Sequence, residues 1–175
     1  MLTFKNIKEN KECISKIKKL YTTSFPENEQ VPFVYLRLKA ESDISDIFGV
    51  YEGDNFIGLL VTLYYKDIVF LWYLAIEHDL RGKGHGSLIL NEAAKKYAGY
   101  RLILNIEEVE NENQQRRKNF YLKNGYRECG FKTMEYGVIY EMLCHDDVVT
   151  YEEYKELMIN YVGKTMYNRI YKRVF

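Results

Sequence analysis

A glycine-rich loop between two apolar segments constrains the fold more than any other feature of this sequence. The loop spans residues 81–86 and reads RGKGHG; it follows the strongly apolar segment 68–76 and precedes the amphipathic segment 87–94. A long apolar run is typical of a buried strand, and apolar residues at helical spacing are typical of an amphipathic helix. Glycines let the main chain approach a ligand, and the N-terminus of a helix presents unpaired N–H groups to it. This order therefore predicts an anion site whose ligand carries phosphate.

The spacing of the glycines separates three kinds of phosphate loop. A Walker loop needs four residues between its first glycine and a Gly-Lys-Ser/Thr triplet, and the segment lacks that arrangement. A dinucleotide loop needs glycines at its first, third and sixth positions; Gly82 and Gly84 fit, but the sixth position is Ser87. The pattern that remains is Arg-x-x-Gly-x-Gly, filled by Arg81, Gly84 and Gly86. An ordinary strand-to-helix turn without a ligand is the alternative.

A second motif lies at 121–126, where a tyrosine near the end of a predicted helix is followed by a glycine and an aromatic residue. Together the two motifs resemble the signatures of the GNAT family of N-acetyltransferases, of the bacterial type. The resemblance covers residues 1–144 in the order of elements, and its specific residues lie in 74–87 and 113–126. It implies a single-domain mixed α/β fold, with a mostly antiparallel central sheet, one parallel βαβ pair and helices on both faces.

Apolar spacing and turn residues predict the order of elements along the chain. The expected elements are a strand at 2–7, helices at 13–20 and 31–40, hairpin strands at 47–51 and 56–64, a strand at 68–76, a helix to about 97, a strand at 101–106, a helix at 113–123 and strands within 126–144. Both prolines fall in the loop 24–32, where they exclude regular helix. The strands before and after the glycine-loop helix are expected to be parallel, because they form a βαβ unit.

Residues 145–175 extend beyond the GNAT-like domain of residues 1–144. Thr150 and Glu153 match a capping box, which predicts a final helix ending near Gly163. Basic residues interleaved with tyrosines follow. We expect this extension to pack on the domain or on a second subunit of a homodimer.

Length and composition exclude several classes of protein. The chain has 175 residues, enough for one domain with a single core. Its 25 Lys and Arg residues balance 25 Asp and Glu residues, so no net charge recruits nucleic acid. No apolar run approaches the roughly 18 residues of a membrane span, and the start lacks the pattern of a signal peptide. We therefore expect a cytoplasmic protein without a membrane partner. The three cysteines and three histidines lack metal-ligand spacing, so no metal is expected.

The GNAT resemblance implies which residues bind acetyl-CoA, the acetyl donor whose product is CoA. Main-chain groups of Leu74, Ala75 and Ile76 are expected to pair with pantetheine, and an N–H near Leu74 to face the thioester oxygen. Plain buried strand is the alternative. The pyrophosphate is expected on the loop residues Arg81, Gly82, Lys83, Gly84, His85, Gly86 and Ser87; within this loop His85 is expected to be a neutral spacer rather than a base. Asn113 is expected to open the next helix and contact the cofactor, unless it is only an N-cap.

The resemblance also implies the catalytic residues. Tyr121 is expected to protonate the leaving thiolate, and a phenol pKa of about 10 keeps it protonated at neutral pH. Packing is the alternative, because the chain has 17 tyrosines. Some family members carry a basic glutamate on the strand before the glycine loop, where this chain has Phe70. Glu107 and Glu108, after the second parallel strand, are the candidate bases, directly or through water; a solvated loop face is the alternative.

Glu27 and Glu29 lie in the loop where the family usually recognises the acceptor, and they are expected to receive a cationic amine unless they are only solvated. The acceptor is expected to be a small-molecule or protein amine. The basic run 116–118 is expected near the 3′-phosphate of CoA. Two other functions stay open: a non-catalytic acyl-CoA-binding or regulatory module, and a nucleotide-binding protein that uses the glycine loop.

Overall fold

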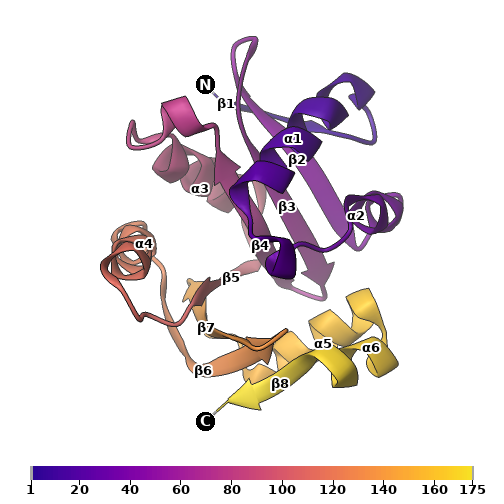
Figure 1. The fold of residues 1–175 in the computed structure, drawn as a ribbon, viewed down its shortest axis with the longest axis vertical. Helices are drawn as coiled ribbons and strands as arrows, with labels where there is room; N and C mark the ends of the chain where they lie inside the picture. Colours follow the sequence, from indigo (N-terminus) through magenta and orange to yellow (C-terminus); the bar gives the residue numbers. More distant parts are fainter. Residues whose placement is uncertain (1, 175) are drawn as a thin grey trace. The chain divides into compact units, whose positions relative to one another are not determined.

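The fold is mixed α/β. The computed structural model describes residues 2–174. It has two compact units: unit 1 contains the residues up to Leu63 together with Leu71–Ala98, and unit 2 contains Tyr64–Phe70 and the residues from Gly99 onward. The strands follow the order β1-β2-β3-β4-β5-β7-β6-β8, in which β4 and β5 are the parallel pair. The predicted mixed sheet with one parallel pair is confirmed (Figure 1).

The elements of the N-terminal half are β1 (Leu2–Asn6), η1 (Lys11–Cys13), α1 (Ile14–Ser24), η2 (Glu27–Glu29), α2 (Phe33–Ala40), β2 (Ser45–Glu52), β3 (Asn55–Tyr65), β4 (Ile68–Ile76), η3 (His78–Leu80) and α3 (His85–Lys96). Those of the C-terminal half are β5 (Arg101–Glu107), α4 (Glu112–Lys123), β6 (Arg127–Glu135), β7 (Val138–His145), α5 (Tyr151–Val162), α6 (Lys164–Ile170) and β8 (Tyr171–Val174).

Alternation along β2 and β3 lets helices cover both faces of unit 1, because successive side chains of a strand point to opposite faces. One face packs against α1 and α2, and its buried cluster includes Ile17, Leu36, Ile47, Leu59 and Val61. On the other face, Lys96 of α3 lies over the ring of Phe48, and the Thr62 and Tyr97 hydroxyls are 3.3 Å apart. Figure 1 shows α1 in front of these strands, α2 beside them on the right and the paler, more distant α3 on the left.

Unit 2 also has a helix on each face of its strands. Phe131 of β6 packs against Tyr154 of α5, with ring centroids 6.0 Å apart. The next residue, Lys132, lies opposite Glu141 of β7, and Glu141 accepts a hydrogen bond from Lys118 of α4 at 2.8 Å. Because neighbouring residues of β6 face opposite sides, α5 and α4 cover opposite faces. The predicted helices on both faces are therefore confirmed in each unit.

The C-terminal extension adds a helix and a strand where the sequence patterns predict only one helix. α5 begins after Thr150, and its capping box with Glu153 is present as predicted. α6 then follows Gly163, and β8 pairs antiparallel with β6 at the edge of the sheet. The rings of Tyr167 and Tyr171 are stacked, with centroids 5.2 Å apart. These buried tyrosines belong to the core of unit 2.

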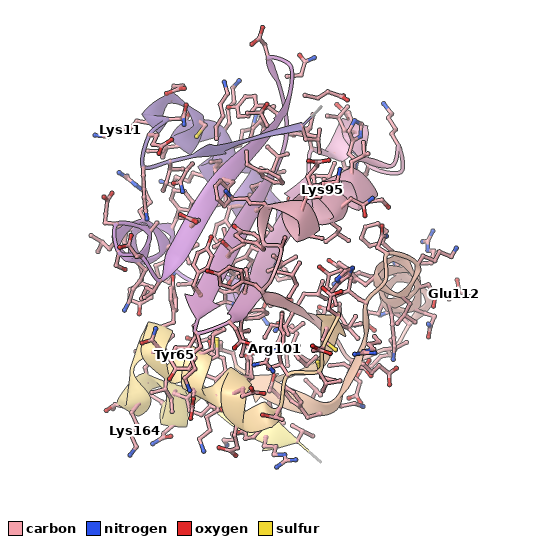
Figure 2. All side chains as sticks on the ribbon, turned by 180° about the vertical axis from the view of Figure 1, so that it is seen from behind. Lys11, Tyr65, Lys95, Arg101, Glu112 and Lys164 are labelled. Carbon is pink, nitrogen blue, oxygen red and sulfur yellow. The ribbon has the colours of Figure 1, made fainter. Side chains whose placement is uncertain are left out.

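Arg101 at the start of β5 connects three segments of unit 2. Its guanidinium donates hydrogen bonds to Asp67 at 2.8 and 3.0 Å, to Glu153 at 2.7 Å and to the Val148 carbonyl at 3.2 Å. Figure 2 labels Arg101 beside the yellow C-terminal helices. The guanidinium lowers the pKa of Glu153 to about 2 and also lowers that of Asp67. Arg101 thus holds the start of α5 against the sheet.

Replacing Glu153 with Gln is expected to reduce stability most at neutral pH. Glutamine keeps an acceptor for the capping box but removes the charge that Arg101 contacts. The ordinary pKa of a glutamate is 4.5, and the pKa of Glu153 in the native chain is about 2. As the pH falls between these two values, the unfolded chain takes up the proton before the native chain does. The wild type therefore loses this contribution in that window. The Glu153 side chain is 35% exposed, so we expect the free energies of unfolding of the two proteins to differ by only about 1 kcal/mol at pH 7. This difference should vanish near about pH 2.

Urea unfolding of both proteins across this pH range measures the difference. Glu152→Gln is the matched control, because it removes only a surface pair with Lys155 at 3.1 Å and should change stability little at any pH. Parallel stability profiles for the wild type and Glu153→Gln would contradict the assignment.

Candidate functional site

The glycine loop of unit 1 has the backbone conformation that its glycines predict. Gly82 has φ +73° and Gly84 has φ +87°, values that residues with a Cβ rarely adopt. A Cβ placed at either position would meet no atom within 4 Å. The glycines are therefore required by the turn itself, and the space above the loop is open for a ligand to approach the main chain.

The N-terminus of α3 has no side-chain cap. Gly84 is its N-cap, the first turn contains no acidic residue, and the Leu88 N–H donates to the Gly84 carbonyl. The N–H groups before Leu88 have no acceptor inside the helix. By contrast, α4 and α5 are each closed by a capping box. The start of α3 therefore fits an anion such as pyrophosphate, which would take the place of a cap.

The side chains of the loop mostly support its shape. Arg81 donates to the Ile76 carbonyl at 3.0 Å and to the Ser24 hydroxyl at 3.4 Å, so its guanidinium turns back towards β4 and α1. His85 Nδ1 lies 3.1 Å from the Leu80 carbonyl, and its Nε2 lies 3.6 Å from the carboxylate at Glu52. The role of His85 as a neutral spacer stays a prediction. Lys83 is exposed. Cofactor contacts by these side chains stay predictions.

Leu74, Ala75 and Ile76 form the end of β4. The register of β4 with β5 runs from Ile68↔Arg101 to Phe70↔Ile103, so these three residues follow the paired part of the strand. On the β3 side, a Cβ at Gly58 would collide with the Ala75 carbonyl. The glycine thus allows β3 to lie close to this end of β4.

Tyr121 of unit 2 lies in the last turn of α4. Its carbonyl accepts from the N–H groups of Asn124 and Tyr126, and its ring packs against Phe120 and Tyr126 at 5.0 and 6.0 Å. Burial raises the pKa of the phenol, although Arg117 acts in the opposite direction. No hydrogen bond among residues 2–174 involves the Tyr121 hydroxyl. A phenol that stays protonated at neutral pH has a property that a general acid needs.

Both candidate bases form ion pairs. Glu107 accepts from Arg117 at 2.9 Å and from Gln114 at 3.5 Å, while Glu108 lies 2.5 Å from the ammonium group of Lys132. Each carboxylate would have to accept a proton while it contacts a cation, or act through water. Their role as bases stays a prediction.

The sequence places the N-cap of α4 at Asn113, but the N-cap lies two residues earlier. Asn111 is the N-cap, and its side chain accepts from the N–H groups of Asn113 and Gln114. The Asn113 side chain instead accepts from Arg116 at 2.6 Å. The N-cap interpretation of Asn113 is wrong, because a capping box with Gln114 already closes the helix. The spacing of an asparagine and a glutamine three residues apart is the signal that reveals this cap.

Phe70, at the position where some relatives carry a glutamate, is fully buried and packs edge-on against Tyr154 of α5 at 5.7 Å. It is a core residue without titratable chemistry. Glu27 and Glu29 lie in the 3-10 turn η2, where Glu27 is exposed and Glu29 is partly buried. Sequence reasoning missed Tyr73 of β4, whose hydroxyl donates to the Glu29 carbonyl at 2.7 Å.

Neither a metal-binding group nor a membrane-spanning helix is found among residues 2–174. Within the described part of the chain, no group of three or more His, Cys, Asp and Glu side chains is placed to hold a metal ion. Between residues 2 and 174, no helix has the length and apolar character needed to cross a membrane.

Comparisons with known proteins agree with the fold. Residues 43–128 match the family model of the acetyltransferase (GNAT) domain. No curated protein sequence matches the chain.

Three solved structures have a similar fold. A protein from Bacteroides thetaiotaomicron, assigned to the GNAT family of acetyltransferases, has a TM-score of 0.77 at 16% identity, covering 93% of this chain and 98% of that chain. A Vibrio cholerae spermidine N-acetyltransferase in complex with CoA and spermine has a TM-score of 0.64 at 15% identity, covering 82% and 94%. A Bacillus subtilis acetyltransferase in complex with CoA has a TM-score of 0.58 at 16% identity, covering 85% and 100%. At these identities the likeness is one of fold.

The mixed sheet with its parallel pair and the domain match over residues 43–128 identify an acetyltransferase of GNAT type. Residues 43–128 carry a GNAT acetyltransferase domain, and the fold of the chain is that of GNAT acetyltransferases.

Proposed function

We propose that the chain transfers the acetyl group of acetyl-CoA directly to a primary amine, without a covalent intermediate on the enzyme. The observation that carries the proposal is the glycine loop, whose positive-φ glycines lead into a helix start without a side-chain cap. Such a start is suited to the pyrophosphate of CoA. Solved relatives of similar fold are described in complex with CoA, which supports the same cofactor here.

In this proposal the chain supplies three groups for the reaction. The amine nitrogen attacks the thioester carbon, and a main-chain N–H near Leu74 donates to the carbonyl oxygen as negative charge develops on it. The carbon–sulfur bond then breaks, and Tyr121 gives its proton to the thiolate. Before it attacks, the bound ammonium loses one proton to Glu107 or Glu108, directly or through water, and the glutamate passes it to solvent. The nitrogen of the tetrahedral adduct then loses its second proton to water. Tyr121 regains a proton from solvent before the next cycle.

The acceptor in this proposal is a cationic amine that Glu27 and Glu29 attract. An alkyl ammonium has a pKa of about 10 and is charged at neutral pH, so carboxylates at the acceptor site favour its binding. A spermidine N-acetyltransferase has a similar fold, which supports testing polyamines first. A panel of polyamines, aminoglycosides and peptide amino termini, read by release of the CoA thiol and by the mass of the product, identifies the acceptor.

Thermal melting with separate ligands tests the cofactor. Acetyl-CoA or CoA at about 100 times its dissociation constant should stabilise the protein by about 2.7 kcal/mol. At about 2–4 °C per kcal/mol, this is a shift of about 5–10 °C in Tm. NAD and ATP at the same concentration should give no shift.

Three other outcomes are informative. A shift with NAD or ATP and none with CoA would favour a nucleotide-binding protein and contradict the proposal. A shift with acetyl-CoA but no turnover with any amine of the panel would favour a non-catalytic acyl-CoA-binding module. No shift with any ligand would remove the assignment of the glycine loop.

A further inference from the structure

The α1–α2 loop (residues 25–32) is held in place by side chains rather than by regular secondary structure. Gln30 donates to the Phe25 carbonyl at 2.7 Å and to the Thr22 carbonyl at 3.2 Å. Tyr21 donates to the Val31 carbonyl at 2.9 Å. Apart from the single 3-10 turn η2, the loop has no repeating hydrogen bonds. Its conformation therefore depends on these side chains.

Tyr73 differs from the other donors because it comes from β4. Its hydroxyl donates to the Glu29 carbonyl at 2.7 Å, 44 residues away in the sequence. Gln30 belongs to the loop and Tyr21 to the preceding helix, so both act locally. Tyr73 instead ties the centre of the loop to the strand that leads into the glycine loop.

Packing leaves the Tyr73 ring little freedom. The side chain is 6% exposed, and its ring makes edge-on contacts with Tyr21 and Phe25 at centroid distances of 5.0 and 4.9 Å. Trp72 adds a tilted contact at 4.9 Å. A buried ring held on several sides fixes the position of its hydroxyl, and a fixed hydroxyl fixes the carbonyl that it contacts.

Through its position in β4, Tyr73 connects the region of the predicted oxyanion donor with the loop that carries the predicted acceptor carboxylates. Tyr73 immediately precedes Leu74, near which the proposed oxyanion donor lies. At its other end it holds the main chain of Glu29, one of the two proposed acceptor carboxylates. A main chain held at Glu29 also limits where the neighbouring Glu27 carboxylate can reach.

We propose that Tyr73 is a positioning residue that holds the α1–α2 loop in the conformation that binds the amine acceptor. This inference rests on the proposed acetyl transfer and adds a determinant of acceptor affinity. Tyr73→Phe keeps the ring and its packing but leaves the Glu29 carbonyl without this donor, and it also removes the side-chain hydrogen bond between Tyr73 and Tyr21. We expect the KM for the amine to rise about 3–20-fold, with the KM for acetyl-CoA within about twofold and kcat changed less than the amine KM.

The test combines steady-state kinetics with amide hydrogen exchange of residues 25–32. The matched control is Tyr97→Phe, which removes a buried hydroxyl that lies 3.3 Å from the Thr62 hydroxyl in the same unit. Tyr73→Phe should raise the amine KM and speed exchange in the loop, whereas Tyr97→Phe should do neither. A merely structural role would lower Tm without separating the two KM values.

Each remaining outcome overturns a definite statement. An unchanged amine KM in Tyr73→Phe, with the wild type active, overturns the positioning role and leaves the proposed function intact. An acetyl-CoA KM that rises in parallel with the amine KM also overturns it, because the effect then is not specific to the acceptor. A wild type that acetylates no amine overturns the proposed function and this inference with it.

Discussion

Replacing Tyr121 with Phe is expected to lower kcat by about 10²–10⁴-fold, the contribution typical of a positioned general acid. The ring and its contacts with Phe120 and Tyr126 remain, so acetyl-CoA affinity should stay within about twofold. Burial raises the pKa of the phenol, which keeps the proton available across the neutral range. Steady-state kinetics and calorimetric titration with CoA measure the two quantities separately.

Tyr126→Phe is the matched control for this loss of activity. The Tyr126 hydroxyl is buried without a hydrogen-bond partner among the described residues, and its ring touches that of Tyr121. Removing it changes the same aromatic cluster without removing the proposed acid. If Tyr121→Phe kept the activity of the wild type, or if both variants lost it equally, the acid assignment would fail.

Replacing Gly84 with Val is expected to weaken CoA binding by about 10–100-fold. The new side chain cannot adopt φ +87° without strain, and it stands where the main chain would approach pyrophosphate. Loss of one hydrogen bond to a charged group costs about 1.5–3 kcal/mol, and about 1.4 kcal/mol corresponds to a factor of ten in affinity. Calorimetric titration with CoA measures the change.

Backbone strain alone would also destabilise the variant, and Gly99→Val separates the two effects. Gly99 has φ +92° and, like Gly84, would meet no atom within 4 Å if it carried a Cβ. It lies after α3 rather than at the start of the helix. Both variants should lose a similar amount of Tm, while only Gly84→Val should lose CoA affinity. Equal affinities in the two variants would refute the pyrophosphate assignment.

Local patterns predicted most elements of the fold, whereas pairings between distant segments were visible only in the structure. The long strand β4, the helix after the glycine loop and the capping box of α5 follow from apolar runs, helical spacing and the pair Thr150 and Glu153. The place of β7 between β5 and β6, and the addition of β8 beyond β6, do not. Strand neighbours depend on contacts across many residues, and a short strand such as β8 has almost no pattern of its own.

The candidate site divides in the same way. Sequence motifs selected the glycine loop and Tyr121, because their chemistry is defined within six residues or fewer. The cations that engage Glu107 and Glu108 come from α4 and β6, and no pattern near the glutamates indicates them. Tyr73 is one of 17 tyrosines, so only its hydrogen bond to Glu29 distinguishes it from a packing residue.

By itself, the sequence determined that a glycine loop joins a buried strand to a helix in an α/β protein. Glycine positions, apolar periodicity and helix caps act over a few residues, so they can be read directly. Only the tertiary structure decided which side chains hold the α1–α2 loop and which cations pair with the candidate bases. Both are contacts between segments that sheet register and helix packing bring together, and local composition does not encode that register.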